Sequence, residues 1–326
     1  MVEISNLNKS FGVRSILKNI NLNIDSGEIL CIVGSSGSGK TTLLRSISGL
    51  EIPDTGRIVL SGETVNHTNI FVPPEKRNCS LVFQDYALFP NLSMKKNIYF
   101  GKNSSENKNM IQDIIDITNI ELIMDKYPHE CSGGEQQRVA LVRSMAINPK
   151  LILMDEPMSN LDYNLKSSLS KVVHNVLKKF ETTAIIVTHD ISDAMRMSDK
   201  IAVIENGTII QIDTPNEIYN NPKSKNVARL FGETNFIPTT MLPESKNFFK
   251  DTDTNEKLTS IRPNQFYICE KDLKDGKTIF DGKIHSIIKI GSDYNIELKT
   301  KDLSLIIQLK ELINLKIGEE LKVMVL

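Results

Sequence analysis

The feature that most constrains this chain is a glycine-rich segment placed between an apolar run and a helical pattern. Residues 34–41 read GSSGSGKT, with ILCIV before them and TLLRSI after them. A buried strand, a glycine-rich turn and a helix in this order surround a phosphate group with backbone amides and a helix N-terminus. Glycine at these positions lets the backbone come close to the anion. The segment therefore predicts an α/β core built around a phosphate-binding loop.

The side chains of this loop indicate a nucleoside triphosphate bound with Mg²⁺. Lys40 is expected to reach the β- and γ-phosphates, and Thr41 to place its hydroxyl on the metal. ATP is the nucleotide we expect. The predicted nucleotide contacts are Gly34, Ser35, Gly37, Ser38, Gly39, Lys40, Thr41 and Thr42.

An acidic pair supplies the complement to the loop. Residues 151–157 read LILMDEP, so an apolar strand delivers Asp155 and Glu156 to its carboxyl end, where ligands of α/β folds bind. Asp155 is predicted to hold Mg²⁺ and Glu156 to act as general base on water. His189 and Gln84 also follow apolar runs. We expect His189 to orient the water and Gln84 to reach the metal or the water, although spacing alone more often makes such residues incidental.

The remaining pattern divides the chain into two regions. Residues 1–25 alternate like paired strands, residues 87–150 are mainly helical in pattern, and apolar strands recur at 151–155 and 183–189. After about residue 235 short strand-like runs are separated by turn signals. The fold prediction is α/β: a P-loop NTPase core with a mixed sheet and a helical subdomain at 87–150. This core spans 1–235 and precedes a small all-β, OB-like domain at 236–326.

Composition excludes several classes of function. The 326 residues carry a net charge of −1, which disfavours a general nucleic-acid binder. No run reaches the roughly 20 apolar residues of a membrane span, and the N-terminus lacks a signal-peptide layout, so a cytoplasmic protein is expected. The four cysteines form no CxxC pair, so neither a disulfide framework nor a zinc site is predicted.

A second glycine pair decides among nucleotide-binding proteins. Residues 131–135 read CSGGE, a capping box in which Ser132 precedes a helix and Glu135 follows three residues later. Two glycines at a helix start lower the stability of the helix, so their presence suggests that the backbone must come close to another group. Ser132, Gly133, Gly134 and Glu135 are therefore predicted to form a second anion-binding surface, which serves the nucleotide of another copy.

Together these segments resemble the ATPase subunit of an ABC transporter. The matching parts, in the family's order over residues 1–235, are the Walker A loop 34–41, Gln84, the signature 131–135, the Walker B strand 151–156, the D-loop 159–162 and His189. Phe11 lies where the family stacks an aromatic ring on adenine. The resemblance implies a head-to-tail homodimer with each ATP between two copies. Cys131 and Glu135 replace the usual leucine and glutamine of the signature, and neither change removes a catalytic group.

Other stretches resemble importers. Residues 85–101 resemble the surface that docks a permease helix, with Tyr86 and Phe89 as exposed aromatic contacts unless they pack in the core. The β-rich tail resembles a regulatory domain. Three stretches resemble the ferric-iron branch of these importers more than the polyamine branch or the branches for other solutes: SGETVNHTNIFVPPEKRN, DKYPHECSGGE and RLFGETNFIP. No residue pattern shows iron chemistry itself. The resemblance implies transmembrane permease partners, indirect work with an extracytoplasmic solute-binding protein, and a peripheral place on the cytoplasmic face of the inner membrane.

Four alternatives stay open at this point. They are a non-transport ABC ATPase of DNA repair or translation, an exporter ATPase, a small-molecule kinase, and a regulatory binding role of the C-terminal domain. The β-rich tail disfavours the exporter, and the Ser-Gly-Gly element with the paired acids disfavours the kinase. The regulatory role is compatible with the ATPase.

Overall fold

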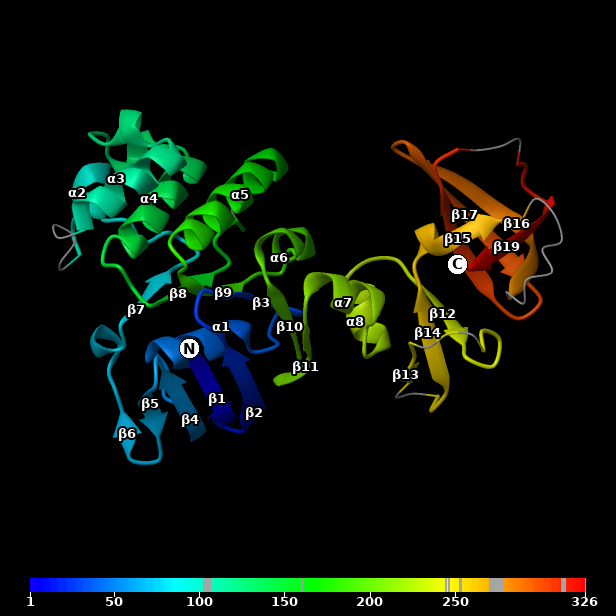
Figure 1. The fold of residues 1–326 in the computed structure, drawn as a ribbon, viewed down its shortest axis with the longest axis horizontal. Helices are drawn as coiled ribbons and strands as arrows, with labels where there is room; N and C mark the ends of the chain where they lie inside the picture. Colours follow the sequence, from blue (N-terminus) through cyan, green and yellow to red (C-terminus); the bar gives the residue numbers. More distant parts are fainter. Residues whose placement is uncertain are drawn as a thin grey trace. The chain divides into compact units, whose positions relative to one another are not determined.

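The chain forms two compact units, Met1–Pro215 and Asn216–Leu326 (Figure 1). The computed structural model describes the chain except residues 102–106, 160, 244, 246, 252–253, 270–277, 312–314 and 326, and the side chains of residues 163 and 164. The boundary expected from the sequence, near residue 235, coincides with the start of strand β12 (Asn235–Pro238), whereas the division between the two compact units lies earlier, at residues 215–216. Within the described residues, no helix combines the length and the apolar character needed to cross a bilayer.

A mixed six-stranded sheet forms the centre of the first unit. Its strand order is β11-β10-β3-β9-β8-β7, and only the β10–β11 pairing is antiparallel. The central strands are apolar throughout because both faces of the sheet are covered. The strands are β3 (Ile29–Val33), β7 (Cys79–Val82), β8 (Leu151–Asp155), β9 (Thr183–Val187), β10 (Lys200–Glu205) and β11 (Thr208–Asp213). The predicted mixed sheet is confirmed.

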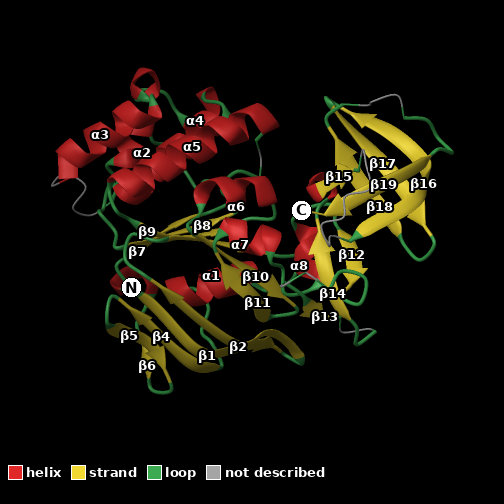
Figure 2. Cartoon of the chain, turned by 45° about the vertical axis from the view of Figure 1, so that its right-hand side comes forward, coloured by secondary structure: helices red, strands yellow, loops and turns green. Residues whose placement is uncertain are grey.

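An antiparallel sheet lies beside it, in the order β2-β1-β4-β5-β6. Its strands are β1 (Val2–Phe11), β2 (Arg14–Ile24), β4 (Thr55–Leu60), β5 (Glu63–His67) and β6 (Ile70–Phe71). Helix α1 (Lys40–Ser48) lies between the two sheets (Figure 2). Leu43, Leu44 and Ile47 of α1 are fully buried in one apolar core shared with both sheets. This packing fixes the position of the helix whose N-terminus follows the glycine-rich loop.

The helical region groups at one end of the first unit (Figure 1). It contains α2 (Met94–Ile98), α3 (Lys108–Thr118), α4 (Gly133–Met145) and α5 (Tyr163–Lys179), and α6 (Ile191–Met197) follows β9. The apolar periodicity of residues 109–127 does not form one helix. Helix α3 ends at Thr118, because Asn119 adopts a left-handed conformation with φ 50° and caps it. A 3₁₀ turn at Glu121–Ile123 follows.

The second unit begins with two short helices and continues as antiparallel sheets. The elements are α7 (Pro215–Asn220), α8 (Lys225–Leu230), β12 (Asn235–Pro238), β13 (Phe249–Lys250), β14 (Lys257–Ile261), β15 (Phe266–Ile268), β16 (Ile279–Ile290), β17 (Asp293–Thr300), β18 (Ser304–Leu309) and β19 (Glu320–Val325). The sheets have the orders β12-β14-β13 and β15-β19-β16-β17-β18. The expected all-β tail is confirmed. The buried guanidinium of Arg262 donates to the carbonyls of Tyr219, Ala228 and Gly232, which attaches the two helices to these sheets.

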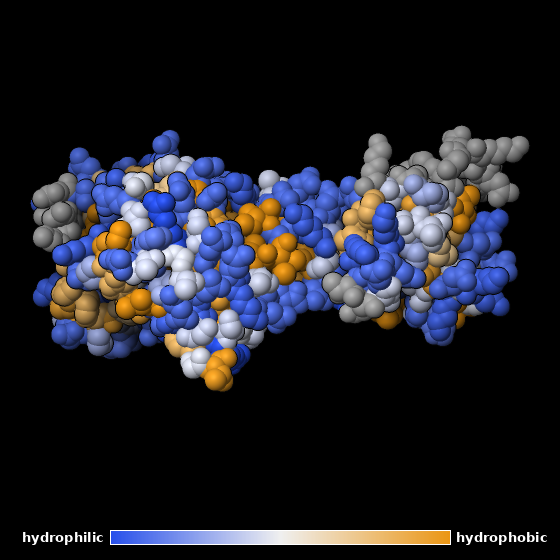
Figure 3. Space-filling model, turned by 90° about the horizontal axis from the view of Figure 1, so that it is seen from below, coloured by the Kyte–Doolittle hydropathy of each residue, from blue (hydrophilic) through white to orange (hydrophobic). Residues whose placement is uncertain are grey.

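The surface of the molecule is largely polar on the face drawn in Figure 3. Hydrophilic side chains cover most of that face, and hydrophobic side chains form separate patches. Scattered apolar residues of this kind are normal on a protein surface.

Candidate nucleotide-binding site

The carboxyl edge of the parallel strands brings distant segments together. Ile32 of β3 and Asp155 of β8 are both paired with Val187 of β9, so these strands end level with one another. In the same way Val82 of β7 is paired with Met154. The predicted residues that leave this edge are Gly34, Gln84, Glu156 and His189. Because parallel strands end on one side of the sheet, segments more than a hundred residues apart in sequence meet there.

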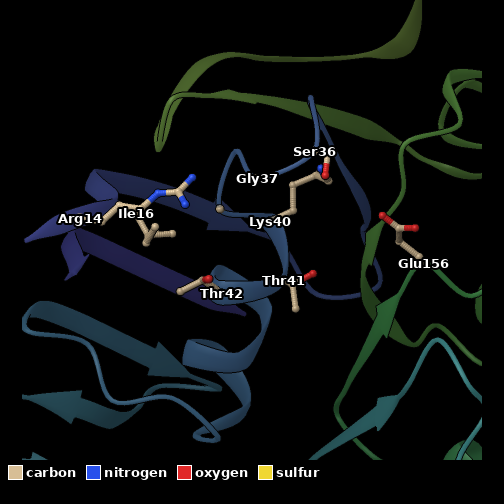
Figure 4. A pocket seen from close by; sticks show the side chains of 9 residues that line it. Arg14, Ile16, Ser36, Gly37, Lys40, Thr41, Thr42 and Glu156 are labelled. Atoms are coloured by element: carbon tan, nitrogen blue, oxygen red, sulfur yellow. The ribbon is translucent and has the colours of Figure 1, made fainter. Parts of the chain in front are cut away.

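A cavity of about 250 Å³ opens at this edge (Figure 4). Its lining residues are Arg14, Ile16, Ser36, Gly37, Gly39, Lys40, Thr41, Thr42 and Glu156. Lys40 is 6% exposed, and its Nζ donates to the carbonyl oxygens of Gly34 and Ser35, each at 2.9 Å. Burial lowers the pKa of Lys40, while the carboxylates of Glu156 and Asp155 oppose this. The cavity thus holds a buried ammonium inside a loop of glycines, as an anion site requires.

Gly39 shows why the loop needs glycine. It caps α1 in a left-handed conformation with φ 107°. A Cβ at this position would lie 2.9 Å from Cδ2 of Leu17 and 3.0 Å from the carbonyl oxygen of Ile16. Any larger residue would therefore be strained and also collide with β2. The loop is pressed against β2 at this point.

Thr41 and Asp155 lie in contact at the foot of the cavity. The Thr41 hydroxyl donates to Oδ1 of Asp155 at 3.0 Å. Burial raises the pKa of Asp155, although the hydrogen bond from Thr41 lowers it in part. A half-buried carboxylate whose charged form is disfavoured gains from a nearby cation. A hydroxyl and a carboxylate oxygen are also the ligand types that Mg²⁺ prefers, so these two residues fit a magnesium ion.

Glu156 is held in a strained backbone conformation. Its φ is 45°, which is uncommon for a residue other than glycine. Its N–H donates to the carbonyl of Val187 at 2.9 Å, and its own carbonyl accepts from the N–H and hydroxyl of Ser159 at 3.2 and 3.0 Å. Nδ1 of His189 lies 3.0 Å from Oε2 of Glu156. Strain that neighbouring bonds maintain is typical of functional sites, and here it turns the carboxylate into the cavity.

The segment 132–135 does not belong to the lining of this cavity. The Ser132 backbone N–H and hydroxyl both donate to Oε2 of Glu135 at 2.7 Å, which forms the predicted capping box at the start of α4. These bonds lower the pKa of Glu135. A Cβ on Gly133 would come no closer than 3.5 Å to the described atoms, and one on Gly134 no closer than 3.9 Å. Packing within the described part of the chain therefore does not require glycine at either position.

The other predicted residues take varied positions. Phe11 ends β1 with half of its surface exposed, and Nζ of Lys9 lies 5.0 Å from the centre of its ring. Gln84 is exposed in the loop after β7. Ser38 is buried, and its N–H donates to the Ser35 carbonyl at 3.2 Å. Phe11, Gln84 and Ser38 are not among the lining residues of the cavity. Asn160 of the D-loop lies outside the described residues.

The expectation that Tyr86 is an exposed aromatic is wrong. Tyr86 is 6% exposed, because the chain turns inward through left-handed conformations at Tyr86 and Ala87. Its hydroxyl lies near Gly133 at the start of α4. Phe89 is exposed, as the sequence predicted.

Sequence reasoning missed three lining residues, Arg14, Ile16 and Ser36. Ser36 lies inside the glycine-rich segment, but it was not among the predicted nucleotide contacts. Arg14 and Ile16 are two residues apart on β2, just after Phe11, so their side chains share one face of the strand. The strand pattern at the start of β2 predicts this shared face, but it does not predict that the face meets the glycine-rich loop.

A phosphate-binding loop at the carboxyl edge of a mixed sheet, with carboxylates from the next strand but one facing it, defines a P-loop ATPase. The family model described as ABC transporter matches residues 17–159. The chain belongs to this family, as the ATP-hydrolysing subunit of an importer.

Curated relatives match along almost the whole chain. The Fe(3+) ions import ATP-binding protein FbpC of Haemophilus influenzae (strain 86-028NP) is 37% identical, over 99% of this chain and 96% of its own length. The Fe(3+) ions import ATP-binding protein FbpC of Escherichia coli (strain K12) is 33% identical over 94% and 90%. The sulfate/thiosulfate import ATP-binding protein CysA of Synechocystis sp. (strain ATCC 27184 / PCC 6803 / Kazusa) is 35% identical over 92% and 84%.

Solved structures match the ATPase part. The dimeric bacterial ABC transporter cassette MJ0796 is 29% identical with a TM-score of 0.57, over 66% of this chain and 99% of that one. CbiO1 from Clostridium perfringens, part of the ABC transporter complex cbiONQ, is 29% identical with a TM-score of 0.61, over 67% and 90%.

Proposed function

We propose that two copies of this chain close head to tail on two molecules of MgATP and thereby drive a permease that imports ferric iron. One observation carries the dimer part of the proposal: the glycine pair at the start of α4 lies outside the cavity and is not required by packing within the described residues, so we assign it to a second nucleotide. In this proposal the cavity around Lys40 binds one nucleotide, and the Ser132–Gly133–Gly134 segment contacts the nucleotide of the other copy.

The glycine pair supports the head-to-tail dimer. Neither Gly133 nor Gly134 is crowded by the described residues of its own chain, yet the two glycines weaken the start of α4. A close approach from outside the chain explains their presence. Amides at a helix N-terminus favour an anion, and the Ser132 hydroxyl, which now donates to Glu135, can turn to donate to one. The γ-phosphate bound to a second copy is such an anion, and the related cassette MJ0796 is described as dimeric.

Each nucleotide is held by the residues around the cavity. Lys40 moves from the carbonyls of Gly34 and Ser35 to the phosphates, and the loop amides between Gly34 and Thr42 surround them. Thr41 and Asp155 hold Mg²⁺, with Gln84 completing its surroundings from the same sheet edge. When bound, Mg²⁺ neutralises charge on the phosphate oxygens. Phe11 supplies an exposed ring for adenine.

Hydrolysis uses the pair at the strand ends. Glu156 accepts the proton of the attacking water, since its carboxylate lines the cavity. His189, 3.0 Å from Glu156, orients that carboxylate and the water. The left-handed backbone of Glu156 fixes the direction of the carboxylate before the nucleotide arrives.

An exposed apolar cluster supports docking to the permease. We call Phe89, Phe100 and Ile147 the apolar patch; they are 37%, 61% and 38% exposed. The rings of Phe89 and Phe100 have their centres 4.3 Å apart, and Ile147 lies against Gly101. A contiguous apolar patch on a polar surface is typical of a protein interface. Docking there places the subunit on the cytoplasmic face of the cell membrane, where it works indirectly with a solute-binding protein outside.

The cargo is ferric iron in this proposal, and sulfate is the second candidate. The FbpC relatives at 37% and 33% identity support iron, and the CysA relative at 35% supports sulfate. Because the cargo is recognised outside this chain, its residues do not decide between them. Polyamines, which the sequence left open, form a third arm of the test.

The test is uptake by cells that lack the gene. Radiolabelled ferric iron, sulfate and spermidine are supplied in turn to starved cells carrying the parent chain, Glu156→Gln or Glu181→Gln. Glu181 is a matched control because it also has a left-handed φ, of 47°, and lies in the turn after α5. Iron uptake should be lost without the gene, restored by the parent and Glu181→Gln, and not restored by Glu156→Gln. Normal iron uptake with loss of sulfate or spermidine uptake would reject iron as the cargo.

A further inference from the structure

We infer that Arg14 binds the phosphate chain of the nucleotide from the side of the cavity opposite Glu156. Arg14 is the first residue of β2 and lines the cavity. Figure 4 shows its side chain directed toward the loop at Gly37. A Cβ built on Gly37 would lie 3.8 Å from Nη2 of Arg14, so the guanidinium reaches the edge of the loop.

The backbone of Arg14 fixes this direction. Arg14 is paired with Phe11 across a tight hairpin, so the start of β2 cannot rotate freely. Side chains two residues apart on a strand share a face. Ile16 is two residues on, and its Cγ2 lies 3.5 Å from the Cβ position of Gly39. Because Ile16 faces the loop, the same face carries Arg14 toward it.

The charges around the cavity leave Arg14 available for an anion. Lys40 is engaged with two loop carbonyls, and Glu156 is 3.0 Å from His189. The guanidinium of Arg14 makes no hydrogen bond or ion pair with any side chain or carbonyl in the described part of the chain. A guanidinium is always charged and presents a planar set of donors that matches phosphate oxygens. The ordinary alternative is a solvated surface arginine, and it explains neither the orientation nor the place in the cavity.

The inference predicts a binding effect that depends on phosphate. Loss of a charge-assisted hydrogen bond to phosphate should weaken ADP and ATP binding by about tenfold or more. Adenosine has no phosphate, so its affinity should stay unchanged. Arg14→Lys keeps the charge without the planar fork and should fall between the parent and Arg14→Ala.

The experiment measures ADP, ATP and adenosine affinities by competition with a fluorescent, ribose-labelled ADP on the full chain. Lys18→Ala is the matched control, since Lys18 is an exposed cation on the same strand outside the cavity. Thermal unfolding of each variant reports the fold. Arg14→Ala should lose ADP and ATP affinity selectively, and Lys18→Ala should behave like the parent. Unchanged ADP and ATP affinity, or an equal loss for adenosine, would overturn the inference.

The inference rests on nucleotide binding in this cavity, which the proposed function also uses. Lys40→Ala, measured in parallel, separates the two. If Lys40→Ala leaves ADP affinity unchanged, the assignment of the cavity itself is wrong. If Lys40→Ala weakens ADP binding and Arg14→Ala does not, only the inference about Arg14 is wrong.

Discussion

The imidazole of His189 contacts the carboxylate of Glu156 across the ends of two adjacent strands, with Nδ1 3.0 Å from Oε2. The His189 side chain is 56% exposed and that of Glu156 is 24% exposed, so water reaches both groups. The contact joins the proposed base to the residue proposed to orient it. Removing the base and removing the orienting residue should therefore reduce ATP turnover to different extents.

Replacing His189 with alanine should slow ATP turnover more than it weakens nucleotide binding. We expect a fall of roughly 10- to 1,000-fold in kcat, which is less than the roughly 100- to 10,000-fold contribution of a general base, because His189 acts through Glu156. ADP affinity should change by less than about threefold, because His189 is not among the lining residues of the cavity. Steady-state kinetics and ADP binding test this, with the exposed His67 changed to alanine as control. Equal losses in kcat and ADP affinity would contradict the orienting role.

Glu156→Gln should stop hydrolysis and still bind ATP. The amide keeps the size of the side chain but cannot take a proton from water, so turnover should fall by about 100-fold or more. ATP should then accumulate in a closed dimer, which size-exclusion chromatography with and without ATP detects. Glu181→Gln should turn over ATP like the parent. A Glu156→Gln variant with parental turnover would remove Glu156 from the mechanism.

Gly39→Ala should damage the loop through collision as well as strain. Its left-handed φ of 107° and the contacts with Leu17 and Ile16 both oppose a Cβ. Gly62 offers a matched control, because its φ is 83° and nothing lies within 4 Å of its Cβ position. We expect Gly62→Ala to cost about 1 kcal/mol of unfolding free energy from strain alone, and Gly39→Ala to cost more and to abolish ADP binding. Denaturant unfolding and ADP titration of both variants check this, and equal costs would show that the close approach to β2 is unimportant.

Regular elements of this chain follow from its sequence because their signals are local. The apolar runs at β3, β8 and β9 and the glycine-rich loop between β3 and α1 appear where periodicity and turn residues place them. The candidate site could be assembled in outline for the same reason. Parallel strands that end in polar residues bring those residues to one edge, whatever lies between them in sequence.

Other features depend on contacts that no local pattern contains. The periodic run after residue 109 continues past Thr118, but the left-handed Asn119 ends the helix. Tyr86 is aromatic and lies beside polar residues, yet tertiary contacts bury it. The approach of Arg14 to the loop depends on how the antiparallel sheet meets the loop, which a single sequence does not report.

Arg143 should prove important for the conformation of the loop after Gln84. Its Nη1 and Nη2 donate to the carbonyls of Ala87 and Tyr86, each at 2.8 Å, and both acceptor residues are left-handed. Arg143→Met keeps much of the aliphatic volume but removes both donors. We expect a loss of about 1–3 kcal/mol in unfolding free energy and faster limited proteolysis within residues 84–90. Arg57→Met is the control, because the Arg57 guanidinium bonds only one side chain, Thr64, among the described residues. Unchanged proteolysis in Arg143→Met would mean that the loop holds its shape without the guanidinium.

The capping box of α4 should make stability depend on pH through Glu135. Its carboxylate accepts two hydrogen bonds from Ser132, which lower its pKa below the ordinary value of 4.5. Because the folded-state pKa is depressed, the stabilising effect is complete above the unfolded-state pKa. It is lost as the pH falls from about 4.5 through the lower folded-state pKa.

Glu135→Gln keeps the capping shape without the charge, so it isolates this effect. The parent should exceed Glu135→Gln in unfolding free energy by an amount on the order of 1 kcal/mol between pH 6 and 8, the usual scale of a helix cap. The difference should stay constant over that range and shrink below about pH 4.5, because both chains then carry an uncharged cap. Urea unfolding of the two chains at a series of pH values measures it. A difference that persists unchanged at the acid end would mean that the carboxylate charge does not stabilise the helix start.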